Sequence, residues 1–472
     1  MSDADPSTDD LLALNGIDGS TGRPAFEALS TARIAQIVRA LLPRPTSGDE
    51  PDDEPQPSGA EPVRGVGDLA MEGWAVVVPK GLDPAIRAAI EPLCALRREQ
   101  AGKRYAELDF DPEQDDFRVW LERHEVSPGS PDRNLVPKYL LLLGPPSLIP
   151  FELQHLLGIE YGVGRLALET VAEYAAYAAS VVRYETAAAA STAREACFWG
   201  PRRDPATELS SDDLLAPLVK GWGRSCGVAE DAGFRATALL ADEATKKSLV
   251  DALHRPAAQR PPTLVFTASH GAVWPSGHAR QAAEQGALLA NDWFPGEIVE
   301  PTHRVAADDV TDDARVHGLV AFFFACYGVA TPAVDGYPRS RAEPPRIIAP
   351  GPLLSALPRR LLAHPRGGAL GVFGHVDRAW GYSIRRAGAV PQIGPFHEGI
   401  LRVLAGAPLG DALGSFSVRY AALSASLLGS LDRGVTPPSD RELAQRWIER
   451  NDAQGYVLLG DPGARVRGDV AP

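Results

Sequence analysis

Uninterrupted apolar runs recur along most of this chain, and each is followed by a longer stretch in which apolar and polar residues are mixed. Runs without alternation, rich in Val, Leu and Phe, are typical of strands that are buried on both faces of a parallel sheet. We interpret the following segments as strands: residues 74–78, 139–144, 162–166, 196–200, 236–240, 263–268, 319–324 and 368–374, with a short strand pair over 456–466.

The stretches between these runs favour helices, which we expect over residues 170–190, 353–363 and 399–428. The first of these is rich in Ala, the residue with the best helix propensity. An alternation of strands and helices predicts an α/β fold, with a mostly parallel sheet flanked by helices. We expect two α/β units side by side, a first subdomain over residues 66–255 and a second over 256–472.

Residues 1–65 form a region of different character. Residues 1–10 are polar and acidic, and residues 43–62 combine prolines with Asp and Glu, which is typical of disordered segments. Between them, the apolar positions of residues 25–42 lie at helical spacing and predict a short helix. A lone helix cannot bury its apolar face, so it either docks back on the body or binds a partner.

Two of the buried strands end in residues of complementary chemistry. The run over 263–268 leads into His270 and Gly271, and the run over 319–324 leads into Cys326. Functional side chains gather at the carboxyl ends of the strands of a parallel sheet. We therefore expect an imidazole and a thiol at the same edge of one sheet.

A Cys–His pair at such an edge is the minimal equipment of a cysteine peptidase. His270 would take the thiol proton of Cys326, and the backbone N–H groups of Gly271 and Cys326 would form the oxyanion hole. The alternative is structural, because Cys is among the most buried residue types and a His after an apolar strand can simply be half-buried. No third residue that orients the imidazole is identifiable. The candidates for orienting the imidazole are Asp308, Asp309 and Asp312, but solvation at the surface explains these acids better.

The separation of His270 and Cys326 is close to the roughly 50 residues between the corresponding residues of caspases. The caspase pattern Q-A-C-[RQG]-G is matched in part, at Ala325, Cys326 and Gly328. The chain thus resembles the caspase-like superfamily of cysteine peptidases (clan CD) rather than the caspases themselves. Within it, the chain most resembles gingipain-type peptidases and bacterial CHAT-like peptidases. This likeness spans roughly residues 70–467 and is carried by Ser269-His270-Gly271, Phe324-Ala325-Cys326-Tyr327-Gly328, Gly374-His375-Val376-Asp377 and Leu458-Leu459-Gly460-Asp461-Pro462.

The resemblance implies a specificity pocket near the catalytic strand and the strand after it. Asp377, at the end of that next strand, could receive an Arg or Lys side chain of the substrate, or it could instead pair with Arg378. Asp335 is an alternative acid on the loop after Cys326, and Trp380 is a candidate wall of the pocket, although aromatic residues are more often core. Arg378 would favour an acidic substrate residue, so the sign of the preference stays open.

The composition narrows the class of function. The formal net charge of −14 argues against a general nucleic-acid binder and against docking on anionic membranes. The four cysteines form no CxxC pair, which fits a reducing compartment and disfavours disulfides and zinc. We see no signal peptide, no transmembrane stretch, no phosphate-binding loop and no dinucleotide fingerprint. We therefore expect a cytoplasmic protein without a metal or other cofactor.

Together these observations predict a cytoplasmic cysteine endopeptidase that uses a Cys–His dyad to cleave a specific protein substrate. A basic residue before the scissile bond is one of the two preferences that Asp377 and Arg378 leave open, and the expected setting is a bacterial stress or defence pathway. The N-terminal segment, residues 1–65, would recruit a partner protein. The alternative is a catalytically inactive caspase-fold scaffold or adaptor, against which the presence of both catalytic residue types argues.

Overall fold

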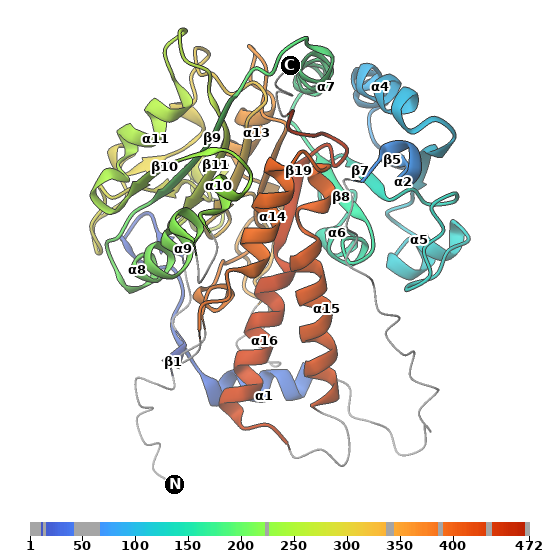
Figure 1. The fold of residues 1–472 in the computed structure, drawn as a ribbon. Helices are drawn as coiled ribbons and strands as arrows, with labels where there is room; N and C mark the ends of the chain where they lie inside the picture. The colour runs from blue at the N-terminus through green and yellow to red at the C-terminus, as the bar shows by residue number, and fades with distance from the viewer. Residues whose placement is uncertain are drawn as a thin grey trace, which may run out of the picture.

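Ten strands pair into one sheet that runs through the molecule, and helices cover both of its faces (Figure 1). A computed structural model of the chain describes residues 11–12, 16–41, 67–221, 226–336, 344–385, 390–430 and 437–467. Every neighbouring pair of strands is parallel except β18 with β19. In order across the sheet the strands are β10 (Arg235–Leu240), β9 (Ala193–Gly200), β11 (Pro262–Ala268), β15 (Val320–Phe324), β18 (Gly371–His375), β19 (Tyr456–Gly460), β8 (Gly162–Leu166), β7 (Tyr139–Leu143), β5 (Trp74–Pro79) and β6 (Tyr105–Phe110).

Helices connect most of these strands, and the predicted fold class, an α/β protein with a mostly parallel sheet flanked by helices, is confirmed. The helices are α1 (Thr31–Leu41), α2 (Leu69–Glu72), α3 (Pro84–Ala89), α4 (Glu91–Ala101), α5 (Phe117–Arg123), α6 (Phe151–Leu157), α7 (Val171–Thr186), α8 (Pro205–Ser210), α9 (Ala216–Lys220), α10 (Val228–Asp231), α11 (Lys246–Leu253), α12 (Gln281–Glu284), α13 (Ala356–Leu362), α14 (Gly394–Leu404), α15 (Gly414–Gly429) and α16 (Asp440–Gln454). Short strands outside the main sheet are β1 (Leu11–Leu12), β2 (Ile17–Asp18), β3 (Arg23–Pro24), β4 (Leu29–Ser30), β12 (Ala272–Val273), β13 (Leu288–Leu289), β14 (Arg304–Val305), β16 (Ala330–Thr331) and β17 (Leu353–Leu354).

A layer of aromatic side chains holds the three central strands of the second half in register. Phe266 on β11, Phe322 on β15 and Phe373 on β18 are directly paired across the strands. The rings of Phe266 and Phe322 stack at 4.9 Å, and those of Phe322 and Phe373 at 5.8 Å. Phe396 of α14 and Phe416 of α15 pack edge to face at 5.0 Å and cover this layer. Because this packing fixes the register of the three strands, it also fixes how their ends are placed relative to one another.

The arrangement of strands differs in two ways from what the sequence predicts. The sheet is continuous across the predicted boundary between residues 255 and 256, because β9 and β10, which we grouped with the first unit, lie beside β11. The closing segment supplies one strand rather than a pair: β19 lies antiparallel to β18 and parallel to β8, and so joins the two halves of the sheet. Apolar runs identify buried strands but do not determine which strands become neighbours.

Two predicted helices are also corrected. The helix expected over residues 25–42 begins only at Thr31, where the Ser30 hydroxyl accepts the N–H of Arg33 at 3.2 Å. Of the two alternatives for this helix, the structure shows it docked on the body, against α16. The segments 1–10 and 43–62 lie outside the described residues. The helix expected over 399–428 is two helices, α14 and α15, because Gly406 (φ +80°) and Pro408 end the first.

A buried charge network anchors the chain directly after β19. Arg97 on α4 forms salt bridges with Asp461 at 2.5 Å and with Glu185 on α7 at 2.6 Å. Asp461 also accepts the indole N–H of Trp74 at 2.8 Å. The side chains of Arg97 and Asp461 are fully buried, so loss of either partner would leave the other as an uncompensated charge away from water.

We expect Arg97→Met to lower the free energy of unfolding by about 3–5 kcal/mol, because Asp461 would lose its counter-charge in a buried site. Urea denaturation followed by circular dichroism measures this change. The matched control is Arg98→Met, which removes a half-exposed cation from the same helix and should leave the denaturation midpoint almost unchanged. Equal midpoints for the two variants would contradict the anchoring role of Arg97.

Candidate active site

The two strand ends that carry the predicted catalytic residues lie side by side. β11 and β15 are parallel, and Ala268 is paired with Phe324. His270 lies two residues after Ala268, and Cys326 lies two residues after Phe324, so the two residues occupy equivalent positions at the strand ends. The N–H of Ser269 continues the pairing by donating to the carbonyl of Phe324 at 3.1 Å. A Cβ at Gly271 would overlap the carbonyl oxygen of Cys326, so only glycine allows this close approach of the two backbones.

His270 is held by an acid that the sequence did not reveal. Its Nε2 donates to Oδ2 of Asp204 at 2.6 Å. Burial by itself would raise the pKa of Asp204, but the hydrogen bond and charge of His270, together with hydrogen bonds from Thr207, outweigh burial and hold that pKa below its usual range. An ionised Asp204 keeps the proton on Nε2 and leaves Nδ1 as the basic nitrogen of the ring.

Asp204 occupies the N-cap of α8, where its carboxylate accepts the N–H of Thr207 at 2.9 Å. The sequence contains the local signal for this cap, an Asp before Pro205, but nothing that connects it to His270. The three candidates named from the sequence lie elsewhere and pair with other cations: Asp308 and Asp309 with Arg304, and Asp312 with Arg360.

Cys326 is buried, with 2% of its surface exposed. Its Sγ lies 3.7 Å from the carbonyl oxygen of Ala379, to which the S–H donates. Burial raises the pKa of the thiol to about 12, so it is protonated at neutral pH and a poor nucleophile in this conformation. The next residue, Tyr327, has φ +56°, a left-handed conformation that costs a non-glycine residue about 1–3 kcal/mol and tends to occur at functional sites.

The hydrogen-bond partners of the two side chains lie on opposite sides of this strand pair. Asp204 follows β9, the neighbour of β11, whereas Ala379 follows β18, the neighbour of β15. The structure therefore brings together the ends of the strands that carry His270 and Cys326, while each side chain is bonded to a different flanking loop.

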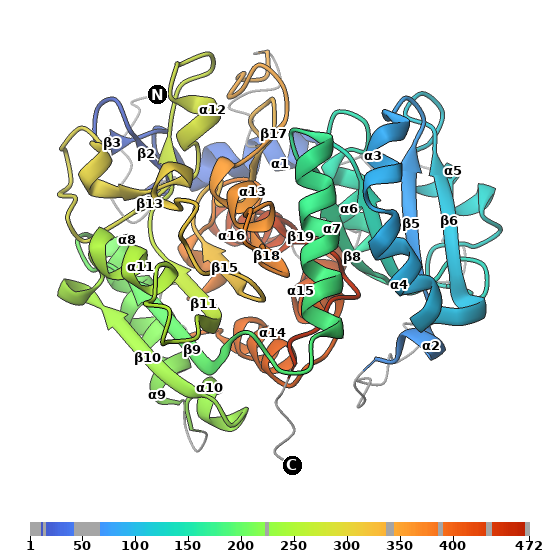
Figure 2. The same cartoon turned by 90° about the horizontal axis from the view of Figure 1, so that it is seen from above.

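The N-terminal segment lies directly over Cys326. β2 pairs in parallel with β12, the short strand that follows Gly271. Figure 2 shows β2 and β3 on the same side of the molecule as α12 and β13, the elements that follow β12 in the chain. A Cβ at Gly16 would lie 3.9 Å from Cβ of Cys326 and 3.6 Å from the ring of Phe26. Phe26 is itself 5% exposed and belongs to the same hydrophobic cluster as Cys326. The burial of the thiol thus depends in part on residues from the beginning of the chain.

Of the three residues suggested for a substrate pocket, Asp377 lines a cavity. This cavity has a volume of about 450 Å³, and Glu152, Val334 and Trp447 also contribute to its walls. The Asp377 carboxylate accepts the N–H of Arg378 at 2.7 Å, and burial raises its pKa to about 6. The same carboxylate lies 3.4 Å from Nε of Arg378, so the alternative pairing of Asp377 with Arg378 is present in the structure. The cavity therefore has acidic groups in its wall, of which Asp377 is already paired with a cation.

The other two suggested residues are engaged in contacts outside that cavity. Asp335 accepts a hydrogen bond from the fully buried side chain of Arg378. Trp380 is buried in the cluster that contains Cys326, and its backbone N–H donates to Asp452 at 2.7 Å. Neither Asp335 nor Trp380 is among the residues that line the cavity at Asp377.

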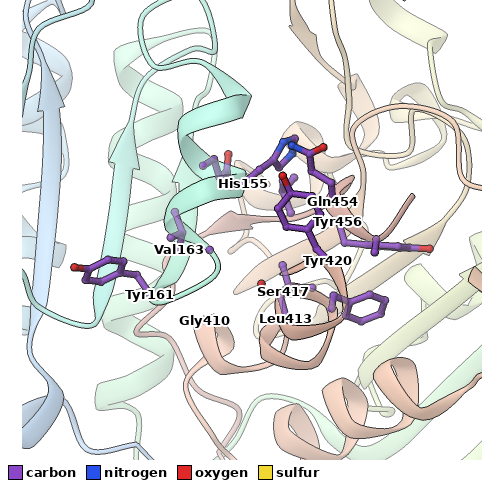
Figure 3. A pocket seen from close by; sticks show the side chains of 14 residues that line it. His155, Tyr161, Val163, Gly410, Leu413, Ser417, Tyr420, Gln454 and Tyr456 are labelled. Carbon is purple, nitrogen blue, oxygen red and sulfur yellow. The ribbon is translucent and has the colours of Figure 1, made fainter. Parts of the chain in front are cut away.

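A second cavity lies between α6, α15 and α16 and shares His155 and Gln454 with the wall of the cavity at Asp377 (Figure 3). Its walls include His155, Tyr161, Ser417, Tyr420 and Gln454. Its volume of about 30 Å³ holds about one water molecule, which is too small for a peptide side chain. We therefore do not consider it a substrate site.

Within the described ranges, no group of three or more His, Cys, Asp or Glu side chains is placed to hold a metal ion. No helix in these parts of the chain combines the length and the apolar character of a membrane span. Cys94, Cys197 and Cys326 are buried free thiols, and Cys226 is an exposed one.

Comparisons with known proteins find only distant structural similarities. No protein-family model matches the chain, and no curated protein matches its sequence. Among solved structures, the chain is similar to one described as "Structure of Protease", with a TM-score of 0.47 and 12% identity over 85% of this chain and 80% of that chain. It is also similar to the complex of the pro- and mature domains of RgpB from Porphyromonas gingivalis, with a TM-score of 0.41 and 12% identity over 84% of this chain and 79% of that chain. At such low identity, a function for this chain has to come from its own residues.

We expect the alkylation rate of Cys326 in the native protein to keep rising, by about tenfold per pH unit, between about pH 7 and pH 10. The thiolate fraction of a group whose pKa is about 12 is far from its plateau in this range. A thiol of ordinary pKa, about 8.5, levels off above about pH 9. Timed iodoacetamide pulses followed by peptide mapping measure the rate, with the protein unfolded in urea as the control. A plateau near pH 9 in the native protein would show that Cys326 reacts from a form in which the thiol is exposed, and not from the buried conformation.

Proposed function

We propose that this protein is a cysteine endopeptidase in which Cys326 is the nucleophile, His270 the base and Asp204 the residue that positions His270. One observation carries the proposal: His270 is hydrogen-bonded to Asp204 at 2.6 Å, at the end of a strand that pairs with the strand ending at Cys326. A nucleophile, a base and a residue that orients the base are what nucleophilic acyl transfer requires.

The reaction would start with transfer of the Cys326 proton to Nδ1 of His270, because Nε2 is bonded to Asp204. The thiolate then adds to the substrate carbonyl, and the resulting oxyanion is stabilised by the backbone N–H groups of Gly271 and Cys326. Collapse of this intermediate breaks the C–N bond, and the leaving amine takes the proton from the imidazolium. Water, deprotonated by Nδ1, hydrolyses the thioester and restores the thiol.

We propose that the cavity at Asp377 receives a basic side chain, Arg or Lys, of the residue before the scissile bond. Asp377 and Glu152 both line this cavity, and a carboxylate pairs well with a guanidinium or an ammonium group. The backbone around Asp377 is close to the nucleophile, since the N–H of Tyr327 donates to the Asp377 carbonyl at 2.8 Å. Arg450 also lines the cavity and keeps its positive charge, because its bonds at 2.7 Å are to the neutral side chains of Tyr420 and Asn451, so the two carboxylates have to outweigh it.

A second candidate function, a caspase-fold scaffold without turnover, is favoured by the burial of Cys326, whose thiol is shielded and protonated in this conformation. The bond between His270 and Asp204 favours the peptidase, because a scaffold has no need for an oriented imidazole. A peptide electrophile that carries a basic residue separates the two functions. Applied to Phe26→Ala, in which the aromatic contact near Cys326 is removed, it should label Cys326 in a peptidase and leave it unmodified in a scaffold.

The catalytic assignment is tested with a positional-scanning peptide library. Because Phe26 packs over Cys326, the library is applied to the wild-type protein and to Phe26→Ala, each with and without Cys326→Ala. We expect cleavage after basic residues in at least one background, and complete loss of cleavage in the Cys326→Ala partner. Cleavage that survives Cys326→Ala, or no cleavage in either background, would end the assignment.

The base and its positioning residue have a separate test. His270→Ala should lower kcat by about 10²–10⁴-fold, the usual contribution of a general base. Asp204→Asn should give a smaller loss and change the pH profile of kcat, because the amide no longer fixes the tautomer of His270. The control is Asp212→Asn, an acid near α8 that pairs with Arg202 instead and should retain full activity. Equal activity of the Asp204 and Asp212 variants would remove Asp204 from the mechanism.

A further inference from the structure

We infer that residues 16–41 form an autoinhibitory cover that occupies the substrate groove and has to leave before a peptide can reach Cys326. We call this segment, which comprises β2, β3, β4 and α1, the cover. The inference rests on the proposed peptidase function for its biological meaning. The shielding of Cys326 by the cover is a property of the chain that can be measured without any activity.

The cover enters the site as an extended chain. β2 pairs in parallel with β12, with Ile17 opposite Ala272. The N–H of Gly19 donates to the carbonyl of Val273 at 2.9 Å, and the carbonyl of Gly19 accepts the N–H of Val299 at 2.9 Å. β12 directly follows His270 and Gly271, so the strand edge beside the proposed oxyanion hole is already occupied. An extended substrate would need the same main-chain donors and acceptors to bind by strand addition.

Close packing leaves no room for a second chain beside the cover. Gly16 has φ +108° and lies so close to the site that a Cβ on it would be 3.0 Å from Val273 and 3.9 Å from Cβ of Cys326. At Gly19, a Cβ would press on the indole of Trp274. The backbone of the cover therefore lies where a substrate backbone would have to pass to present its carbonyl to the thiol.

Phe26 adds a side chain of the cover to the site, beside Gly16. It belongs to the cluster of Cys326 and Trp380, and its ring lies 3.9 Å from the guanidinium carbon of Arg378. A second cation, Arg346, lies 4.8 Å from the same ring. These contacts bury the aromatic ring of Phe26, and this burial supplies a large part of the affinity of the cover for the site.

α1 ties the cover to the body beyond the site. Ile34 and Val38 are buried against Leu443 and Trp447 of α16 in the same cluster, and Arg39 pairs with Asp440 at 2.7 Å. The ion pair is half exposed and contributes little, so apolar burial supplies most of the attachment. An attachment made of one helix and one aromatic side chain can open without unfolding the sheet.

The test compares the alkylation rate of Cys326 in the full-length wild type, Phe26→Ala and Phe110→Ala. Phe110 is a buried phenylalanine on β6, at the far edge of the sheet, and serves as the matched control for general loosening. We expect Phe26→Ala to raise the rate at Cys326 by about tenfold or more and Phe110→Ala to leave it unchanged. The buried Cys94 and Cys197, mapped in the same digests, should react no faster in either variant.

Equal rates at Cys326 in the wild type and Phe26→Ala would overturn the cover, as would an equal rise in Phe110→Ala. If Phe26→Ala does not fold, Val38→Ala decides by the same criterion, with a smaller expected rise of about threefold, because it removes only two methyl groups from the α1 contact. Peptide hydrolysis by the same samples separates the two proposals. If Phe26→Ala is alkylated faster than the wild type but hydrolyses no peptide, the cover is supported and the peptidase function is rejected. If the wild type and Phe26→Ala hydrolyse peptide at the same rate, the peptidase function is supported and the cover is rejected.

Discussion

The candidate site depends on the register between β11 and β15. Pairing of Phe266 with Phe322, under Phe396, sets this register through a stack of rings in the core. Because side chains alternate between the two faces of a strand, a slip of one residue would turn each phenylalanine away from this core and would also misplace His270 against Cys326. The chemistry at the edge of the sheet is thus determined by packing in its interior.

The surroundings of His270 and of Cys326 come from different parts of the chain. The imidazole of His270 receives its orienting carboxylate from the loop after β9, which belongs to the body of the sheet. The environment of the Cys326 thiol is shared between the body, through Trp380, and the N-terminal segment, through Phe26. His270, the proposed base, is therefore held by parts of the main sheet, whereas the burial of Cys326, the proposed nucleophile, also involves the N-terminal segment.

Much of the sheet could be predicted from the sequence, because buried strands appear as continuous apolar runs, and the ends of β11 and β15 already pointed to His270 and Cys326. Neighbour relations could not be predicted, since the position of β19 depends on contacts with Arg97 and Trp74 that lie far away in the sequence. The contact between Asp204 and His270 could not be predicted for the same reason. The loop that carries Asp204 follows β9, and it lies beside His270 because β9 is the neighbour of β11. The position of residues 16–26 over Cys326 depends on β12, a strand of two residues without a pattern of its own.

β19 has a consequence for how the molecule is made. It lies between β18 and β8 and is the last strand of the described chain to be synthesised. Until residues 456–460 have left the ribosome, the strands on its two sides have no backbone partner at their facing edges, and Asp461 is not yet available to neutralise Arg97. The half with β5 to β8 and the half with β9 to β18 can each collapse earlier, but they can merge only after β19 has been made. A nascent or truncated chain therefore exposes two open sheet edges, the kind of surface on which chaperones act and from which aggregation starts.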